Sequence, residues 1–389
     1  MQNTTVLVSG ASIAGPALAY WLARYGFDVT VVEKAPRVRP GGQAVDFKGA
    51  THETVLRRMG ILDEVRAAAT GGQDGTVVDA AGRTLAVVPG EFTGGDVEIA
   101  RGDLAHLLFE RTAATCTYVF DDSITSLDET AEGVAVTFAR SAPRTFDLVV
   151  GADGIHSNVR RLAFGPESDH VRHLGYHYAL ADLGAQLDVS REQLYNEPGR
   201  MAATGGVKAP VFFVFASEPL AFDRDDVEEQ KRLVADAYRG VGWRVPELLA
   251  QLPAAREFYL DAIARVTMDR YTRGRVALLG DAAYGNTLGG FGTGLAVVGA
   301  YVLAGELARA DGDHEAAFAR YETVFRRYAR VSQKVNAGRL LAPRTRLGMR
   351  ARNWLFSVSF LFAPMMRLSD RFATDIELED YPAELAPTG

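Results

Sequence analysis

The pattern of apolar and polar residues at the start of the chain is typical of a strand, a helix and a second strand. Residues 6–8 (VLV) form a short apolar run of the kind found in buried parallel strands. Residues 16–25 have helical spacing, and the β-branched run 29–32 ends at Glu33. The glycine-marked residues 10–15 lie between the first strand and the helix, so the pattern predicts a tight β–turn–α–β unit.

The elements that follow predict a chain that passes between two sheets. Residues 34–49 are rich in proline and glycine and predict a loop, and residues 54–69 predict a helix. Residues 71–95 alternate short β-like runs with turn residues, which predicts a hairpin that joins a sheet elsewhere. Helical spacing returns over residues 98–113.

The middle of the chain has a different texture. From about residue 168 to residue 267, aromatic-rich, strand-like runs dominate, with one helical segment near residues 228–241. At Gly274 the sequence returns to strand, glycine-rich loop and helix, and an arginine-rich helical tail runs from residue 314 to about residue 371. This order predicts an α/β fold in which an antiparallel β-sheet substrate-binding domain is inserted into a discontinuous, Rossmann-like cofactor domain.

The expected domain boundaries follow from these changes of texture. We assign residues 1–72, 97–167 and 268–310 to the discontinuous cofactor-binding domain. Residues 73–96 and 168–267 are assigned to the substrate-binding domain, and residues 311–389 to a C-terminal helical segment.

Composition narrows the class of protein. The 389 residues carry a formal net charge of −7, which argues against a nucleic-acid partner. Cys116 is the single cysteine, so there is no disulfide framework, and a reducing cytoplasm is the expected compartment. Residues 354–366 are apolar with arginines on both sides, but this run is too short to span a bilayer. We expect it to pack as a helix against the domain junction, without membrane contact.

The turn at residues 10–15 has the chemistry of a site for an ADP-containing cofactor. Gly10 permits the tight turn, Gly15 lets the helix pack closely on the strand, and free N–H groups at the helix start face a pyrophosphate. Ser12 stands where the G-x-G-x-x-G pattern has its middle glycine. Glu33 would accept hydrogen bonds from an adenosine ribose and disfavours a 2′-phosphate, so the site predicts FAD or NAD.

Two further motifs extend the pattern, GADG at residues 151–154 and GDAA at residues 280–283. Together with the first turn, LVVGADGIHSNVR and ALLGDAAYGNTLGGFGTG resemble the three fingerprints of the class A flavin-dependent aromatic monooxygenases, the para-hydroxybenzoate hydroxylase fold group. Within this group, GGQAVDFKG, EIARGDL and VGAYVLAGEL look most similar to tetracycline-inactivating and polyketide-tailoring flavin monooxygenases.

The resemblance implies an FAD-dependent enzyme that consumes NADPH or NADH. Reduced flavin would react with O₂ to a C4a-hydroperoxide that hydroxylates an aromatic or polycyclic, polyketide-like small molecule, in antibiotic biosynthesis or resistance. A monomer or weak dimer is expected, and no histidine spacing indicates a metal site. Two alternatives stay open: another FAD oxidoreductase, either an oxidase or a dehydrogenase, and a non-catalytic flavoprotein that sequesters a ligand.

The family's site residues map onto motifs of this chain. The implied cofactor-binding residues are Gly10, Ser12, Ile13, Ala14, Gly15, Glu33, Lys34, Gln43, Asp46, Arg101, Asp153, Gly154, Asp281, Gly292, Thr293, Gly294 and Leu295. Arg101 would reach the ribityl–phosphate region, Asp281 would bond the ribityl chain, and the helix that starts at Gly292 would offer N–H groups to the isoalloxazine. Asp153 would lie near the cofactor, and Asp46 either caps a strand or points toward the flavin. The candidate substrate contacts are Tyr178, Phe213 and Phe291.

The third fingerprint departs from the family pattern. The usual prolines after GDA are missing, with Gly285 and Thr287 at or near their positions. Phe291 stands for the usual glutamine and Gly294 for the usual asparagine. The extra glycines loosen the loop, and Phe291 adds an apolar face beside the ring. These changes bear on the flavin contacts and on the substrate, and they leave the expected fold intact.

Overall fold

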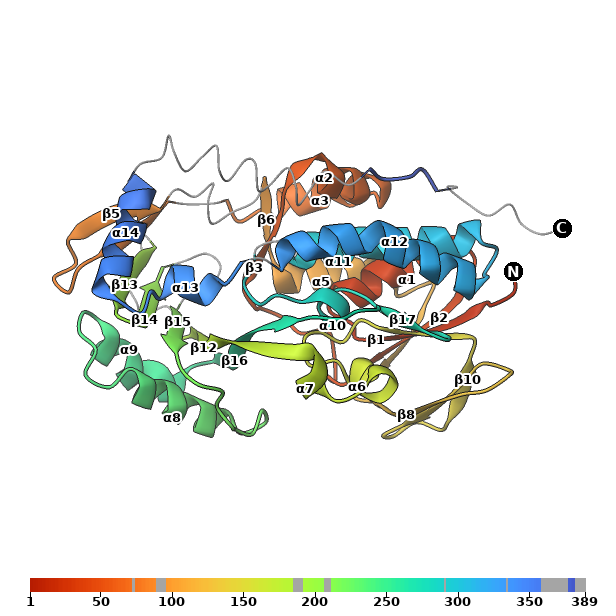
Figure 1. Cartoon of the computed structure of the whole chain (residues 1–389), viewed down its shortest axis with the longest axis horizontal. Helices are drawn as coiled ribbons and strands as arrows, with labels where there is room; N and C mark the ends of the chain where they lie inside the picture. Colours follow the sequence, from red (N-terminus) through yellow and green to blue (C-terminus); the bar gives the residue numbers. More distant parts are fainter. Residues whose placement is uncertain are drawn as a thin grey trace.

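Two sheets organise the molecule (Figure 1). The structure is a computed structural model that describes residues 1–71, 74–88, 96–184, 192–205, 211–289, 292–333, 335–357 and 377–381. The elements below lie within these ranges, and none of the described helices is long and apolar enough to cross a membrane.

The first sheet has six strands in the order β17–β18–β11–β1–β2–β7. The strands are β1 (Thr5–Ser9), β2 (Asp28–Glu33), β7 (Thr117–Phe120), β11 (Leu148–Gly151), β17 (Thr272–Arg273) and β18 (Val276–Leu278). Every pair is parallel except β17 with β18. Because parallel strands end at the same edge, the loops after β1, β2, β11 and β18 gather there.

Four long helices lie together over this sheet in Figure 1. They are α1 (Ala14–Arg24), α5 (Arg101–Thr112), α11 (Gly292–Arg309) and α12 (His314–Ser332). Apart from Glu306, the buried part of α11 carries no charged residue, and this apolar sequence lets the helix pack between α1 and α12 with Gly294 to Ala308 buried. The core of the cofactor half is therefore built on α11, β1 and α1.

Smaller elements border the six-stranded sheet. A three-stranded sheet consists of β8 (Ile124–Glu129), β9 (Val134–Phe138) and β10 (Arg144–Phe146), and β3 (Ala44–Phe47) pairs with β6 (Val97–Ala100). The short helices are α2 (Gly49–Arg58), α3 (Leu62–Ala67), α6 (Asn158–Phe164), α7 (Glu167–His170) and α10 (Asp281–Tyr284). α6 packs against β8, β11 and β18.

The second sheet has seven strands in the order β16–β12–β15–β14–β13–β4–β5. Its strands are β4 (Gly75–Val78), β5 (Thr84–Val88), β12 (Val171–Asp182), β13 (Gln193–Glu197), β14 (Arg200–Thr204), β15 (Val211–Ala216) and β16 (Glu257–Val266). One face packs on α8 (Val227–Ala237), α9 (Val245–Gln251) and the 3₁₀ helix η1 (Leu252–Ala254). The other face meets α13 (Ala337–Leu341), and α14 (Arg346–Ser357) packs on β5.

The hairpin β4–β5 crosses from the first part of the chain into this second sheet, as the alternating pattern of residues 71–95 predicts. Its strand β4 pairs with β13 in parallel, so the expected antiparallel sheet has one parallel pair. The apolar tail begins inside α14 at Trp354, whose side chain is 61% exposed, and residues 358–366 lie outside the described residues.

Three local predictions are wrong, one because of a glycine turn and two because of pairing between distant strands. The single helix expected over residues 54–69 is two helices, since Gly60 adopts φ = +69° between α2 and α3. The expected loop at residues 34–49 contains β3, and the helix expected over residues 98–113 begins only after β6, with which β3 pairs. Pairing between such distant strands leaves no signal in either segment.

The turn after β1 is possible only with a glycine at position 15. A Cβ there would lie 1.9 Å from the Gly10 carbonyl oxygen, and the clash is between backbone atoms that no rotamer change relieves. This contact places the start of α1 directly at the end of β1.

We therefore expect Gly15→Ala to lower the free energy of unfolding by about 3 kcal/mol or more, at the upper end of overpacking effects. Gly60→Ala is the control, because no atom lies within 4 Å of its added Cβ, and Gly60, unlike Gly15, has a positive φ that any side chain would strain. That variant should lose only about 1–2 kcal/mol from backbone strain. Urea unfolding of both variants gives the comparison, and equal losses would contradict the close contact.

Candidate functional site

Three elements hold the glycine turn after β1. Gly10 has φ = +106°, and its N–H donates to the Val32 carbonyl at 2.8 Å. A Cβ at Gly10 would lie 2.5 Å from the Ala152 carbonyl oxygen, so the loop after β11 also touches the turn. Among the described residues, no side chain caps α1 at Ala14, and the first turn of α1 has no acidic residue. The N–H groups at this helix start are available to an anion.

Glu33, at the end of β2, fastens the same turn. Its Oε2 accepts the Ala11 N–H at 2.8 Å, and its Oε1 accepts the Ala35 N–H at 2.9 Å. Arg39 lies 4.0 Å from the same carboxylate, and Lys34, the next residue in the chain, is exposed. A carboxylate has about four lone-pair sites, so these bonds leave capacity for ribose hydroxyls. The sequence did not reveal the structural use of Glu33, and its ribose contact stays a prediction.

Arg101 lies at the centre of the predicted cofactor residues. It begins α5, and its Nη2 donates to the Ser12 hydroxyl at 3.0 Å. Burial raises the pKa of Asp281, Tyr178 and Tyr259, and in each case the charge of Arg101 partly lowers it. The charge of Arg101 thus acts on the loop after β18 and on the seven-stranded sheet. The same side chain contacts the glycine turn through Ser12.

A close backbone approach brings the loop before β3 to Arg101. A Cβ on Gly102 would lie 2.5 Å from the Gly41 nitrogen, and the Arg101 N–H donates to the Gln43 carbonyl at 3.3 Å. Asp46 follows on β3 with a half-buried side chain. The structure therefore brings Gln43 next to the glycine turn through Arg101, although 89 residues separate Arg101 from Ser12.

Asp281 is a solvent-exposed carboxylate with protein packed closely around it. Gly280 (φ = +64°) turns the chain after β18, and Asp281 begins α10. The side chain is exposed to solvent, yet so much protein surrounds it that burial raises its pKa. Within the described residues, no group donates a hydrogen bond to this carboxylate. A Cβ on Gly292 would lie 3.3 Å from Asp281 Oδ1, so the start of α11 adjoins it.

The start of α11 also explains one departure from the family pattern. A Cβ on Gly294 would lie 2.1 Å from Cε1 of His52, because the imidazole occupies the space beside the helix. His52 is buried, its Nδ1 accepts the Lys48 N–H at 3.0 Å, and burial lowers its pKa to about 4. A residue larger than glycine at position 294 would displace this ring. Sequence reasoning missed His52, which carries no motif.

Asp153 of the second motif links the start of α6 to the end of β1. Its carboxylate accepts the Asn158 N–H at 2.9 Å and the Val159 N–H at 3.1 Å at the start of α6. It also accepts hydrogen bonds from the hydroxyls of Ser157 and Ser9. Burial raises the pKa of Asp153. Gly154 has φ = +82° with open space beside it. The contact of both residues with a cofactor stays a prediction.

A charged network that sequence reasoning missed links this motif to the seven-stranded sheet. His156 Nε2 lies 3.0 Å from Asp261 on β16, and His156 Nδ1 lies 3.0 Å from Glu167. Tyr259 donates to Asp261 at 2.7 Å, and Arg224 lies 3.5 Å from it. Burial lowers the pKa of His156, but the two carboxylates outweigh it and the net pKa is raised. No local signal joins positions 105 residues apart.

The three candidate substrate residues have different positions. Tyr178 lies on the face of the seven-stranded sheet that also carries Phe212 and contacts Leu288, in the loop after α10. Phe213 is fully buried on the opposite face, edge-on to Tyr238 of the α8 side, so the expectation that it lines a ligand cavity is wrong. Alternation along β15 is the reason. Phe291 lies outside the described residues.

These residues together fit FAD. The uncapped start of α1 matches the pyrophosphate, and Arg101 beside Ser12 supplies a cation for a phosphate. Asp281, which has no protein donor within the described residues, offers an acceptor to ribityl hydroxyls. The start of α11 at Gly292 adjoins this acceptor. The donor set therefore suits a long phosphate- and hydroxyl-bearing cofactor stretched along one sheet edge.

Comparisons with known proteins agree with this chemistry. A family model described as "FAD binding domain" matches residues 3–335. A flavin-dependent monooxygenase of Legionella longbeachae is 39% identical over 344 residues, which cover 86% of this chain and 88% of the relative.

Solved structures are similar over almost the whole chain. Tetracycline destructase Tet(51) superposes with a TM-score of 0.82 at 30% identity, covering 97% of this chain and 99% of that one. Tetracycline destructase Tet(55) gives a TM-score of 0.80 at 35% identity, covering 98% and 99%.

The raised pKa of His156 predicts a pH-dependent contribution to stability. A protonated imidazole between Asp261 and Glu167 stabilises the fold fully below the unfolded-state pKa of about 6.5, and this stabilisation is lost as pH rises through the higher folded-state pKa. We expect His156→Gln to lose about 2 kcal/mol near pH 5.5 and much less near pH 9, since the bonds are charge-assisted. Urea unfolding across this pH range tests the prediction, and a loss that does not depend on pH would contradict a protonated His156 between the two carboxylates.

Proposed function

The chain belongs to the FAD binding domain family of flavin-dependent monooxygenases, and from that premise we propose that it oxygenates a planar, polycyclic small molecule. The observation that carries the proposal is the convergence of three remote segments around Arg101. Ser12 contacts it directly, and its charge acts on Asp281 and on Tyr178 of the seven-stranded sheet. The predicted cofactor residues and a candidate substrate face thus both lie within the influence of the charge of Arg101.

We assign each segment a part in holding FAD, which supplies the oxygen-activating chemistry when bound. The turn from Gly10 to Gly15 would bind the pyrophosphate, with Arg101 beside it. Glu33 would use its spare lone pairs for the ribose, and Asp281 would accept from the ribityl hydroxyls. The N–H groups at the start of α11 would stabilise negative charge on the reduced ring.

The two sheets support one domain for FAD and one for the substrate, with the boundaries predicted from sequence. Residues 1–72, 97–167 and 268–310 would form the FAD domain, which includes the six-stranded sheet. Residues 73–96 and 168–267 would form the substrate domain with the seven-stranded sheet, and residues 311–389 would form the C-terminal helical segment. NADPH or NADH would act as a transient reductant. We further propose a cytoplasmic monomer or weak dimer.

The substrate class rests on one sheet face and on the structural neighbours. The face that carries Tyr178 is apolar through Phe212, Ile263 and Leu288, which suits a large planar ligand. The hydroxyls of Tyr178 and Tyr259 at its margin would orient a polar edge of that ligand. Two similar structures are named tetracycline destructases, and tetracyclines are polycyclic and hydroxyl-rich.

Asp281→Asn is expected to weaken FAD binding by about tenfold to a hundredfold, because a hydrogen bond to a charged acceptor contributes about 1.5–3 kcal/mol. The apoprotein at pH 7 should be no less stable, since the raised pKa of Asp281 means that its charge is disfavoured there. FAD titration and urea unfolding give the two values.

Asp225→Asn is the matched control, because Asp225 is an exposed carboxylate in the turn before α8. It should change neither value. An unchanged FAD dissociation constant in Asp281→Asn would show that this carboxylate does not hold the cofactor.

A panel of phenolic and polycyclic ligands tests the substrate class on the FAD-loaded protein. We expect polycyclic ligands to accelerate NADPH or NADH oxidation, and ¹⁸O₂ to label the product. Hydrogen peroxide without labelled product would identify an oxidase. Binding of polycyclic ligands with no acceleration by any of them would identify a sequestering protein.

A further inference from the structure

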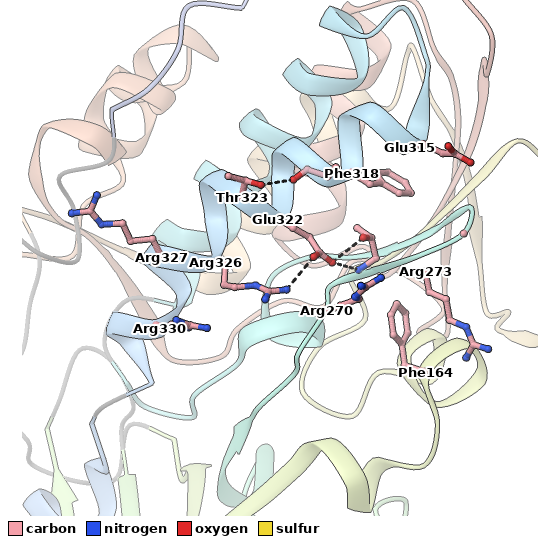
Figure 2. A pocket seen from close by; sticks show the side chains of 13 residues that line it. Phe164, Arg270, Arg273, Glu315, Phe318, Glu322, Thr323, Arg326, Arg327 and Arg330 are labelled. Atoms are coloured by element: carbon pink, nitrogen blue, oxygen red, sulfur yellow. Dashed lines mark hydrogen bonds and ion pairs between the residues drawn. The ribbon is translucent and has the colours of Figure 1, made fainter.

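A concave surface lies beside α12. It is an open groove of about 1140 Å³ between α12, β17 and the end of α6, and none of the predicted cofactor residues lines it (Figure 2). One face of α12 forms the long wall, with lining residues three or four positions apart from Glu315 to Arg330. At the rise of an α-helix this wall is roughly 22 Å long.

The groove concentrates positive charge in a chain whose net charge is −7. Its lining includes two glutamates and five arginines, namely Arg270, Arg273, Arg326, Arg327 and Arg330. Glu322 is already engaged by the floor of the groove, because its Oε1 accepts the N–H groups of Tyr271 at 2.7 Å and Thr272 at 2.9 Å. Its Oε2 pairs with Arg326 at 3.0 Å, so it offsets one arginine only.

The other arginines have no acidic partner in the part of the chain that the structure describes. Arg270, Arg327 and Arg330 are exposed, and among the described residues no carboxylate lies within ion-pair distance of them. Arg273 donates to the Ala163 carbonyl at 2.6 Å, which fixes its guanidinium near Phe164. Figure 2 shows Arg327 and Arg330 toward one end and Arg273 toward the other, with Arg270 between them. Such a row of like charges repels itself until an anion spans it.

We propose that this groove binds a small molecule that carries two or more phosphate groups. The planar fork of arginine matches phosphate in two parallel hydrogen bonds, and cations spread along the groove select an extended polyanion over a single phosphate. The half-buried Phe164 ring lines the same groove and offers apolar surface to a nucleobase. A nucleoside polyphosphate and a pyridine dinucleotide both have this chemistry. The proposal does not depend on the proposed function.

Titration of the full-length, FAD-loaded protein tests the groove with four probes: inorganic tripolyphosphate, ATP, NADPH and NADH. At about 0.15 M salt we expect saturable binding of at least one phosphate probe, weakening as salt is raised. The double substitution Arg327→Glu and Arg330→Glu should weaken it at least tenfold. Tighter binding of NADPH than of ATP would identify the dinucleotide as the source, and the reverse order a nucleoside polyphosphate.

The control is the double substitution Arg346→Glu and Arg350→Glu, which makes the same change in charge at exposed positions on α14. It should leave binding unchanged, and retained FAD and an unaltered melting curve show that both variants fold. No saturable binding by any phosphate probe overturns the proposal. Equal weakening in both variants also overturns it, as does binding of an acidic polypeptide such as polyglutamate while the phosphate probes fail.

Discussion

Backbone packed directly on backbone at one sheet edge is the constraint on which the rest of the site depends. Gly15 approaches the Gly10 carbonyl so closely that no side chain fits, and Gly10 in turn meets the carbonyl of Ala152. These contacts place the start of α1 and the ends of β1 and β11 within one small volume. Glu33 then fixes the turn to β2, because its Oε2 accepts the Ala11 N–H while its Oε1 accepts the N–H of Ala35 just beyond the strand. The helix start can face a phosphate because, in the part of the chain that the structure describes, no side chain caps it.

Electrostatics at this edge favour a bound ligand over an empty site. Asp281 is surrounded by protein and has no donor among the described residues, so its ionised form is disfavoured until a hydroxyl-bearing ligand approaches. Arg101 eases the problem through its charge and also holds Ser12. The Asp281 carboxylate therefore lowers the stability of the empty protein at the place where binding needs a free acceptor. Functional sites often depart in this way from the optimum for folding alone.

Local motifs made the cofactor half predictable from sequence. The glycine turn, the acid at the end of β2 and the helices α1 and α11 each have a local sequence pattern, and all four appear close to where the pattern places them. What the sequence could not reveal depends on segments that meet only in three dimensions. His156 pairs with Asp261, and His52 fills the space that Gly294 leaves. The sequence also could not reveal that Phe213 faces the helices and cannot contact a ligand. Alternation along β15 separates the two faces of the sheet but does not say which face the helices cover.

The path of the chain between the two sheets has a consequence for biogenesis. Strand β4 is made early, but its partner β13 begins at Gln193, and β11 must wait for β18 at Val276 before its second edge is covered. A nascent polypeptide emerging from the ribosome at about 5–20 residues per second would hold these apolar edges open for several seconds or longer. Neither sheet can be completed by the first half of the chain alone. Production of this protein in a foreign host should accordingly depend on chaperone capacity during synthesis. If the chain were divided between β4 and β13, each fragment would lack strands that both sheets need.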